Sequence, residues 1–277
     1  MSIPILSRNR GGSFAAGPAA PAAASGYDLD DSYNITTTPF IHWDASTLVA
    51  ENSASDGSTF STWTSREGSD YDLVQADAAE QFTYEATSST MNSQPVAYSS
   101  DGARHMMTAT SFLSAGTFTF PCTLISAIYY PSGASVASMW MGEDLSSTGL
   151  WKFQDYTPIS SNYTCYITGK GSGPTWADGA QINIWEFDPA SSSNYFYKEL
   201  ARTAVGENYS ESLNPFNDQF ALGGTTSGTY DIKTNTEIGE FIIFNEILSD
   251  TTMSGSNVNG GELFTIISYL KNKYGIS

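Results

Sequence analysis

The sequence predicts an all-β protein: one antiparallel β-sandwich, or jelly roll, with a short C-terminal helix and an extended N-terminal arm. Three observations predict this fold class. Short β-branched and aromatic runs recur along the chain, and turn residues separate them. Charged residues make up only 14% of the composition. A helical apolar period occurs only near the C-terminus, so strands must build the core, for which 277 residues are ample.

Residues 1–26 form a segment rich in Pro, Gly and Ala, with two arginines and no acidic residue. Such a composition cannot bury a core of its own, so the segment is either a disordered tail or an arm that a partner chain holds. We expect an anchoring arm. Its apolar and basic side chains are the expected contacts: Ile3, Ile5, Leu6, Arg8, Arg10 and Phe14. The short apolar start is interrupted by Pro4, which argues against a secretory signal.

The segment Tyr27–Thr38 is acidic and rich in hydroxyl groups. Its aspartates lack the spacing of a calcium-binding loop, so we expect a solvated loop. The globular body opens at Phe40, and no later composition shift suggests a second domain. The expected organisation is therefore an arm over residues 1–26, a connector over 27–39 and a sandwich over 40–277.

Strand-like runs follow from Phe40 onward. The predicted strands are Tyr71–Gln75, Gln94–Ser99, Met106–Ala109, Thr117–Tyr130 with a break at Pro121, Val136–Met141, Leu150–Gln154, Tyr163–Thr168, Gln181–Phe187, Tyr195–Leu200, Phe220–Leu222 and Gly239–Phe244. Many of them alternate between two faces. Ile182 and Ile184 share one face, whereas Asn183 and Trp185 share the other. Alternation of this kind is typical of antiparallel sheets.

The last forty residues carry the clearest local pattern. After the strand Gly239–Phe244, apolar residues recur with helical spacing at Leu263, Ile266, Ile267, Leu270 and Tyr274. Gly275 follows as a natural helix C-cap. The chain is therefore expected to end on a buried strand, a loop and a docked helix.

Several motifs occur along the chain in this order: His42–Ser46 (HWDAS), Trp63 with Asp72–Gln75, Asn92–Gly102 (NSQPVAYSSDG), Phe220–Gly224 (FALGG) and the ending GEFIIFN…EILSD…YLKNKYGI. In this order they resemble the motifs of concanavalin A-like (laminin-G-like) lectin and glucanase domains. The resemblance covers roughly residues 40–277 and implies a β-sandwich. It implies little about activity, because this fold hosts binders, enzymes and inert modules. The body also resembles lectin-like domains of tailed-phage structural proteins.

Charge and cysteine content exclude several classes of function. A net charge of −18 argues against nucleic acid as a partner, because phosphate binding needs clustered Lys and Arg. No apolar run approaches the roughly 18 residues of a membrane span. Cys122 and Cys165 lie in strand-like segments, where they either face one another or stay reduced and buried; we expect buried thiols.

Catalytic carboxylates are the first candidates for chemistry. A glucanase of this fold needs a Glu-x-Asp-x-x-Glu pattern that places a nucleophile and an acid on one strand face. Glu186 and Asp188 supply the first two acids, but Ser191 stands where the second glutamate belongs. Three further acids near the C-terminus are spaced wrongly for one strand face: Glu237, Glu240 and Glu246. We therefore expect no glycosidase activity from these residues.

Other catalytic patterns are also lacking in the sequence. Of the two histidines, His42 stands beside Trp43 in the opening strand and is expected to be structural, and His105 is expected at the surface. No nucleophile elbow, phosphate-binding loop or Cys/His metal spacing is present. Gly169–Gly173 (GKGSG) lacks the flanking strand and helix of a phosphate loop and is interpreted as a hairpin turn. We expect no catalytic residue, no metal site and no cofactor.

Aromatic residues near loops are the remaining candidates. Sugar rings stack on exposed aromatic side chains, although tryptophans more often fill a sandwich core. The candidate glycan-binding residues are Trp140, Trp151, Tyr156, Trp176 and Tyr195.

Our leading hypothesis is a non-catalytic phage virion protein, not an enzyme. Its arm would dock on capsid or tail proteins, with homo-oligomers in the assembly, and the sandwich would face outward to decorate the particle or contact host glycans. Such a protein assembles in the host cytoplasm and is extracellular as part of the particle. The first alternative is a free extracellular glycan-binding lectin module. The second is a divergent glycoside hydrolase.

Overall fold

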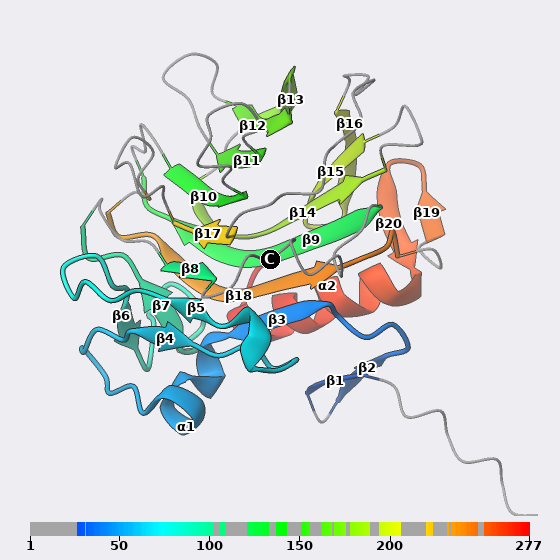
Figure 1. The fold of residues 1–277 in the computed structure, drawn as a ribbon. Helices are drawn as coiled ribbons and strands as arrows, with labels where there is room; N and C mark the ends of the chain where they lie inside the picture. Colours follow the sequence, from blue (N-terminus) through cyan, green and yellow to red (C-terminus); the bar gives the residue numbers. More distant parts are fainter. Residues whose placement is uncertain are drawn as a thin grey trace, which may run out of the picture.

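The computed structural model describes residues 27–30, 32–101, 106–108, 121–132, 137–142, 151–155, 162–167, 169–175, 178–188, 194–205, 220–223, 232, 234–248 and 252–277. In these residues two antiparallel sheets pack face to face, and a helix covers the outer side of the larger sheet (Figure 1). The predicted fold class, an antiparallel β-sandwich with a C-terminal helix, is confirmed.

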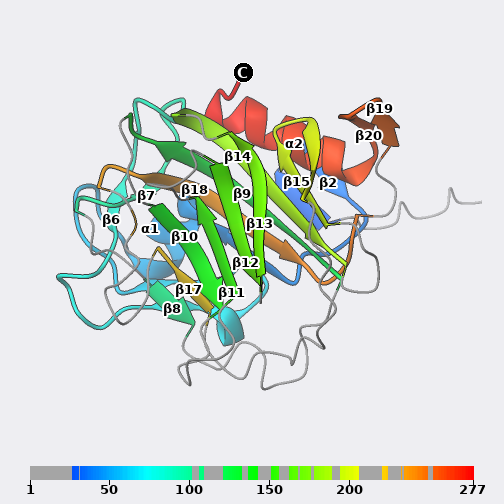
Figure 2. The same cartoon turned by 90° about the horizontal axis from the view of Figure 1, so that it is seen from above.

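The eight-stranded sheet, called the small sheet here, has the order β13-β12-β11-β10-β17-β8-β5-β4. Its strands are β4 (Thr62–Trp63), β5 (Leu73–Val74), β8 (Met106–Thr108), β10 (Ala137–Gly142), β11 (Trp151–Asp155), β12 (Asn162–Ile167), β13 (Gly169–Thr175) and β17 (Phe220–Leu222). Strands distant in sequence are neighbours, since β17 lies between β10 and β8. Figure 2 shows β10–β13 lying over the middle of the large sheet.

The ten-stranded sheet, called the large sheet, has the order β19-β20-β16-β15-β14-β9-β18-β7-β6, with β3 also paired to β18. Its strands are β3 (Ile41–Asp44), β6 (Thr83–Glu85), β7 (Val96–Tyr98), β9 (Cys122–Tyr130), β14 (Gly179–Phe187), β15 (Asn194–Lys198), β16 (Ala201–Val205), β18 (Glu237–Phe244), β19 (Thr252–Ser254) and β20 (Asn257–Gly260). The two longest strands, β9 and β14, pair along their whole length at its centre.

The core between the two sheets is rich in aromatic rings. Trp43 of β3 stacks on Phe220 of the small sheet and on Phe241 of the large sheet, with ring centroids 5.4 and 5.8 Å apart. Trp63 and Trp185 are also fully buried in this core. The tryptophan of the HWDAS motif therefore joins the sheets, because aromatic stacking adds to the burial of a large apolar surface.

Helix α2 (Gly261–Tyr274) covers the outer face of the large sheet. The five residues of its predicted apolar stripe are all buried there, which confirms the helical pattern. Gly275 caps the helix in the left-handed region with φ 65°, and its N–H donates to the carbonyl of Lys271. No helix among the residues that the structure describes is long and apolar enough to cross a membrane.

A β-bulge interrupts strand β18 at Gly239. The register with β9 shifts between Ile238 and Glu240, so one extra residue enters the strand. Glu237 and Glu240 consequently share the outer face, although their spacing in sequence predicts opposite faces. The prediction that these two acids cannot share a strand face is therefore wrong, and a bulge is the physical reason.

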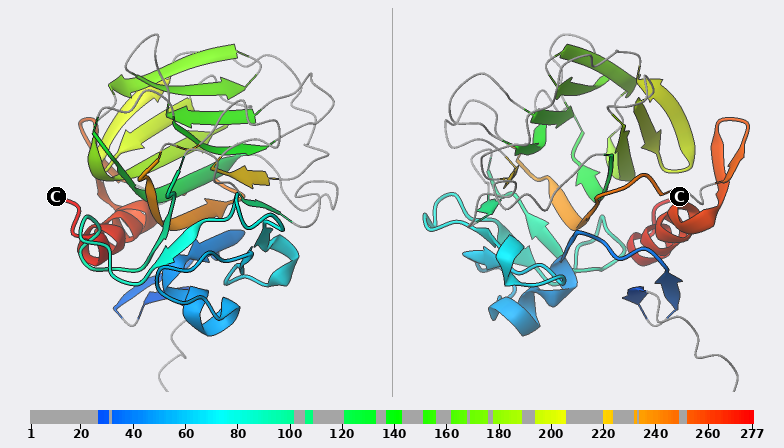
Figure 3. Two further views of the ribbon diagram at one scale, coloured as in Figure 1. Left: turned by 90° about the vertical axis from the view of Figure 1, so that its left-hand side faces the viewer. Right: turned by 45° about the vertical axis from the view of Figure 1, so that its right-hand side comes forward.

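The segment after the arm is a hairpin and not the solvated loop that the acidic residues predicted. Strands β1 (Tyr27–Asp30) and β2 (Tyr33–Ile35) pair with each other, and Leu29 and Ile35 are buried with residues of α2. Figure 3 shows this hairpin and α2 on the same side of the large sheet. Apolar residues at alternate positions therefore outweigh the aspartates between them.

Two further expectations are corrected. Gly169–Gly173 lies within strand β13 and is not a hairpin turn. A short helix, α1 (Leu48–Asn52), occurs well before the C-terminus, preceded by the 3-10 turn η1 (Ala45–Thr47); a second such turn is η2 (Ser69–Tyr71).

Cys122 is buried in the large sheet, whereas Cys165 belongs to a strand of the small sheet. Their redox state stays a prediction, as does the division into arm, connector and sandwich.

Candidate functional site

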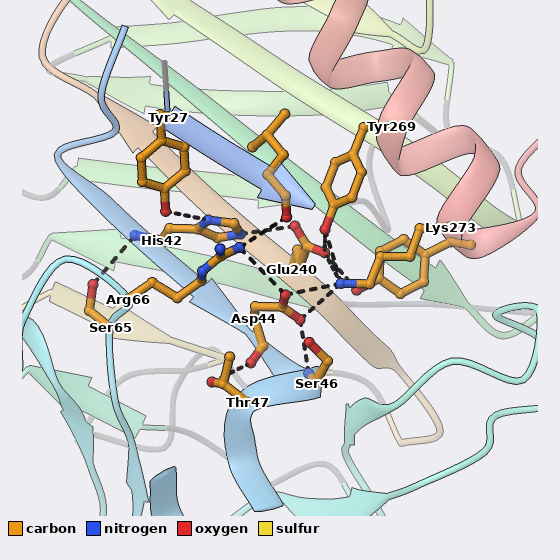
Figure 4. Close-up of polar contacts among 12 residues, drawn as sticks. Tyr27, His42, Asp44, Ser46, Thr47, Ser65, Arg66, Glu240, Tyr269 and Lys273 are labelled. Carbon is orange, nitrogen blue, oxygen red and sulfur yellow. Dashed lines mark hydrogen bonds and ion pairs between the residues drawn. The ribbon is translucent and has the colours of Figure 1, made fainter. Parts of the chain in front are cut away.

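A cluster of charged residues is buried between the large sheet, helix α2 and the hairpin β1–β2 (Figure 4). We call it the buried charged cluster; its members are Tyr27, His42, Asp44, Arg66, Glu240, Tyr269, Lys273 and Tyr274. Strands β3 and β18 are antiparallel neighbours, and their register pairs Asp44 with Glu240. Helix α2 places Tyr269 and Lys273 above them, because residues four apart lie on one helix face, and Tyr274 follows directly after Lys273.

Glu240 stands at the centre of the cluster and is fully buried. Its Oε1 accepts hydrogen bonds from Tyr269 Oη at 2.6 Å, from Tyr274 Oη at 3.2 Å and from Lys273 Nζ. Its Oε2 accepts from His42 Nε2 at 2.9 Å. Both oxygens therefore have donors, which a buried carboxylate requires.

Asp44 shares the same ammonium. Lys273 Nζ lies 3.0 Å from both Oδ1 and Oδ2 of Asp44, and Arg66 Nη1 lies 3.9 Å from Oδ2. Asp44 Oδ1 also accepts the N–H of Ser46 at 2.8 Å, which caps the turn η1. The aspartate of the HWDAS motif thus joins the start of the body to its last helix.

His42 links the cluster to the first hairpin. With its proton on Nε2, the ring donates to Glu240 and accepts at Nδ1 from Tyr27 Oη, 3.0 Å away. Arg66 donates to the carbonyls of Leu29 and Asp28 in the same hairpin. Tyr27, the first residue after the arm, is therefore hydrogen-bonded to the interior of the sandwich.

The ion pairs determine the protonation states. Burial alone would raise the pKa of Glu240, but the Lys273 ammonium and the His42 hydrogen bond outweigh burial and lower that pKa to about 2. Burial would lower the pKa of Lys273, but Glu240 and Asp44 hold it above its ordinary value. Glu240 and Lys273 are therefore both charged at neutral pH.

Three members of the cluster resemble a metal-ligand set. His42, Asp44 and Glu240 each present one ligand atom, and these atoms lie within 4.8 Å of one another. Nitrogen and carboxylate ligands of this kind suit zinc. However, the Lys273 ammonium already contacts both carboxylates, and a divalent cation beside it would be repelled. These residues therefore do not fit a metal while Lys273 is present. The geometry is that of ion pairs that hold helix α2 on the large sheet.

A second polar group lies on the same outer face, on strands β14, β15 and β16. Glu186 is 3% exposed, and Tyr197 Oη donates to its Oε2 at 2.5 Å. Burial raises the pKa of Glu186, although the Tyr197 hydrogen bond and the Arg202 charge oppose the rise. The Arg202 guanidinium lies over the Tyr195 ring, 4.4 Å from its centroid. We call these four residues the Glu186 group.

Of the five aromatic residues predicted to bind glycans, Tyr195 is the one whose surroundings the structure describes. It is half-buried on the outer face of the large sheet. The backbones of Trp140 and Trp151 lie in β10 and β11 of the small sheet, so they are not on the same sheet as Tyr195. Tyr156, Trp176, His105 and the six arm residues lie outside the described residues.

Sequence reasoning missed the partnership of His42 with Glu240. The two residues are 198 positions apart, and only the pairing of β3 with β18 brings them together. Gly239 was the available signal, since a glycine inside a strand often marks a bulge. The sequence also gives no sign that Tyr269 and Lys273 contact Glu240.

Comparison with solved structures finds the same fold in carbohydrate-active proteins. Domain 4 of AbnA, a GH43 extracellular arabinanase from Geobacillus stearothermophilus in complex with arabinotriose, matches with a TM-score of 0.54 and 11% identity. The match covers 83% of this chain and 98% of that one. Trypanosoma rangeli sialidase matches with a TM-score of 0.50 and 9% identity, over 84% of this chain. No family model and no curated protein sequence matches.

The chain spans about a third of the sialidase chains, with 32% covered in one structure and 36% in another. These identities establish the fold and leave activity to proposal. They also contradict the expectation that the chain is not an enzyme, because the similar structures come from glycoside hydrolases, a sialidase and an arabinanase. That expectation rested on the missing second glutamate and on the lack of other catalytic patterns in the sequence, and it is withdrawn.

Proposed function

We propose that this chain is a glycan-binding β-sandwich module. The observation that carries the proposal is the likeness to Domain 4 of AbnA, a domain of similar extent whose structure holds arabinotriose. Nearly the whole of that domain is matched, so the shared part is a complete sandwich and not a fragment of one.

The outer face of the large sheet supports the proposal. Tyr195 offers a half-buried aromatic ring, and Glu186 and Arg202 stand beside it with an acceptor and a donor. Sugar-binding surfaces commonly combine an aromatic platform with a few placed polar groups. The buried charged cluster lies on another part of this face, where it stabilises the sheet that carries Tyr195.

The test is binding of the full chain to a glycan array, followed by calorimetric titration with arabinotriose and with each glycan that the array selects. Saturable binding to at least one glycan is the expected result. Absence of binding to every glycan at millimolar concentration would overturn the proposal. Tyr195→Ala reports on the face involved, and Tyr129→Ala is its matched control, since Tyr129 lies on the same face at the far end of β9.

Glycoside hydrolysis is the second candidate, and Glu186 is the observation in its favour. A buried carboxyl with a raised pKa is the form that a general acid takes. Incubation of the chain with arabinan and with a sialoside, followed by assay of released reducing sugar and sialic acid, tests this activity. Release that Glu186→Gln abolishes would support it, and release that survives the change would exclude Glu186 as the acid.

The particle-surface role stays a prediction about the arm. If residues 1–26 anchor the chain on capsid or tail proteins, deletion of residues 2–26 should abolish co-sedimentation with particles. Unchanged co-sedimentation would exclude the arm as the anchor.

A further inference from the structure

The Glu186 group contains a buried oxygen with an unmet hydrogen-bonding capacity. Glu186 Oε2 accepts from Tyr197, but Oε1 is shielded from solvent and has no hydrogen-bond partner in the described part of the chain. A buried acceptor without a donor costs about 1–3 kcal/mol, so such atoms call for an explanation. A bound ligand that donates to Oε1 would supply one.

Strand register brings the rest of the group to this oxygen. Glu186 of β14 pairs with Tyr195 of β15, and Tyr197 pairs with Arg202 of β16. On the other side of β14, Thr123 of β9 pairs with Glu186 and donates its hydroxyl to the carbonyl of Glu246. The described charged and titratable groups that face Glu186 are therefore Tyr195, Tyr197 and Arg202, with Asp188 just after the end of β14.

The charges in the group select the chemical class of the ligand. An anionic ligand would be repelled by Glu186 and attracted by Arg202, and an ammonium would be attracted by Glu186 and repelled by Arg202. A neutral polyol avoids both penalties, because each hydroxyl can donate to Glu186 Oε1 and accept from Arg202. The apolar face of a sugar ring can also lie against Tyr195.

We propose that Glu186, Arg202 and Tyr195 form a subsite for the vicinal hydroxyls of a neutral sugar, with Tyr197 as a positioning residue. This inference rests on the proposed glycan-binding function and assigns it to one place on the fold. Oε1 is covered before binding, so a side chain must move to admit the ligand. We expect Arg202 to be the group that moves, because its guanidinium lies over the Tyr195 ring and its long side chain is only half-buried.

Proton linkage follows from the same geometry. Burial raises the pKa of Glu186, because the loss of water around the carboxylate outweighs the Tyr197 hydrogen bond and the Arg202 charge. A sugar hydroxyl on Oε1 stabilises the carboxylate and lowers that pKa. Ligand affinity should therefore rise as the pH rises through the pKa of the unliganded protein, and a purely structural Glu186 would give no such dependence.

The experiment uses the full chain and the neutral glycan that the array binds best, with arabinotriose as the first probe. Titrations are made from pH 4 to pH 8 with wild type, Glu186→Gln, Arg202→Met and Tyr195→Ala, after circular dichroism has confirmed folding. Each variant should weaken binding about tenfold at pH 7. Glu186→Gln should also remove the pH dependence. Glu85→Gln is the matched control, since Glu85 lies in β6 near the opposite edge of the sheet.

Two failures are distinguishable. If wild type binds a glycan but the three variants bind within twofold of it with the same pH dependence, this subsite is wrong and the proposed function stands. If wild type binds no glycan of the array or arabinotriose, the proposed function fails and this inference fails with it.

Discussion

Among the residues of the buried charged cluster, Lys273 should contribute most to stability, because both buried carboxylates contact its ammonium. Its side chain is only 15% exposed, so water screens the interaction weakly. Removing one partner of a buried pair costs more than the pair itself contributes, since the other partner is left charged and unpaired.

We predict that Lys273→Met lowers the free energy of unfolding by about 3–5 kcal/mol. Urea denaturation followed by circular dichroism measures the change. Lys271→Met is the matched control on the same helix: Lys271 pairs with Glu199 at 3.9 Å with both side chains more than a quarter exposed, so its loss should cost below about 1 kcal/mol. Equal losses in the two variants would contradict a stabilising role for the ion pairs of Lys273 with Asp44 and Glu240.

At the scale of elements, the bulge in β18 and the ring of Tyr274 depend on each other. A Cβ added to Gly239 would lie 2.4 Å from the Tyr274 ring, which is closer than atoms pack. The glycine therefore makes room for the tyrosine, whose hydroxyl donates to Glu240.

We predict that Gly239→Ala destabilises the protein by about 1–3 kcal/mol through overpacking. In a double-mutant cycle with Tyr274→Leu, the two changes should cost less together than the sum of their separate effects. Strict additivity would show that the close contact is not the cause.

Helix α2 also holds the segment that follows the first hairpin. Glu262, in the first turn of the helix, accepts the N–H of Thr37 at 2.8 Å and both the N–H and the hydroxyl of Thr36. These bonds, together with the Tyr27–His42 contact, fix the hairpin β1–β2 against the sandwich.

We predict that Glu262→Ala releases this segment locally. Amide hydrogen exchange of residues 27–37 should accelerate about tenfold or more, while exchange in β9 and β18 should stay unchanged. Uniform acceleration across the sheet would mean that Glu262 supports the whole fold and not the hairpin alone.

Sequence patterns predicted the elements with regular periods and missed those that depend on distant partners. The stripe from Leu263 to Tyr274 has a helical period, so it identified α2. Leu29 and Ile35 of the first hairpin are buried against α2, and no local pattern in the sequence reveals that α2 lies over them. The role of Glu240 likewise depends on a bulge that moves it to the outer face. Tyr195 was identified as a candidate, but its neighbours Arg202 and Glu186 became visible only through strand register.

For the whole molecule, the lowered pKa of Glu240 makes stability depend on pH. The group ionises at a lower pH in the folded protein, where its pKa is about 2, than in the unfolded chain, where the ordinary value is 4.5. Its contribution is therefore fully present above about pH 4.5 and is lost as the pH falls toward 2.

We predict that the difference in unfolding free energy between wild type and Glu240→Gln shrinks by about 3 kcal/mol between pH 6 and pH 2. Denaturation of both proteins at several pH values measures it. A difference that does not change with pH would show that Glu240 is not ionised by its partners in the folded state.

The central claim is that the outer face of the large sheet binds a neutral glycan beside Tyr195. The most direct measurement is a crystal structure of the full chain with arabinotriose or with the glycan that the array binds best. We predict a sugar ring against Tyr195 with a hydroxyl on Glu186 Oε1 and the Arg202 side chain displaced. A sugar bound on the small sheet, with Oε1 still lacking a donor, would contradict the claim.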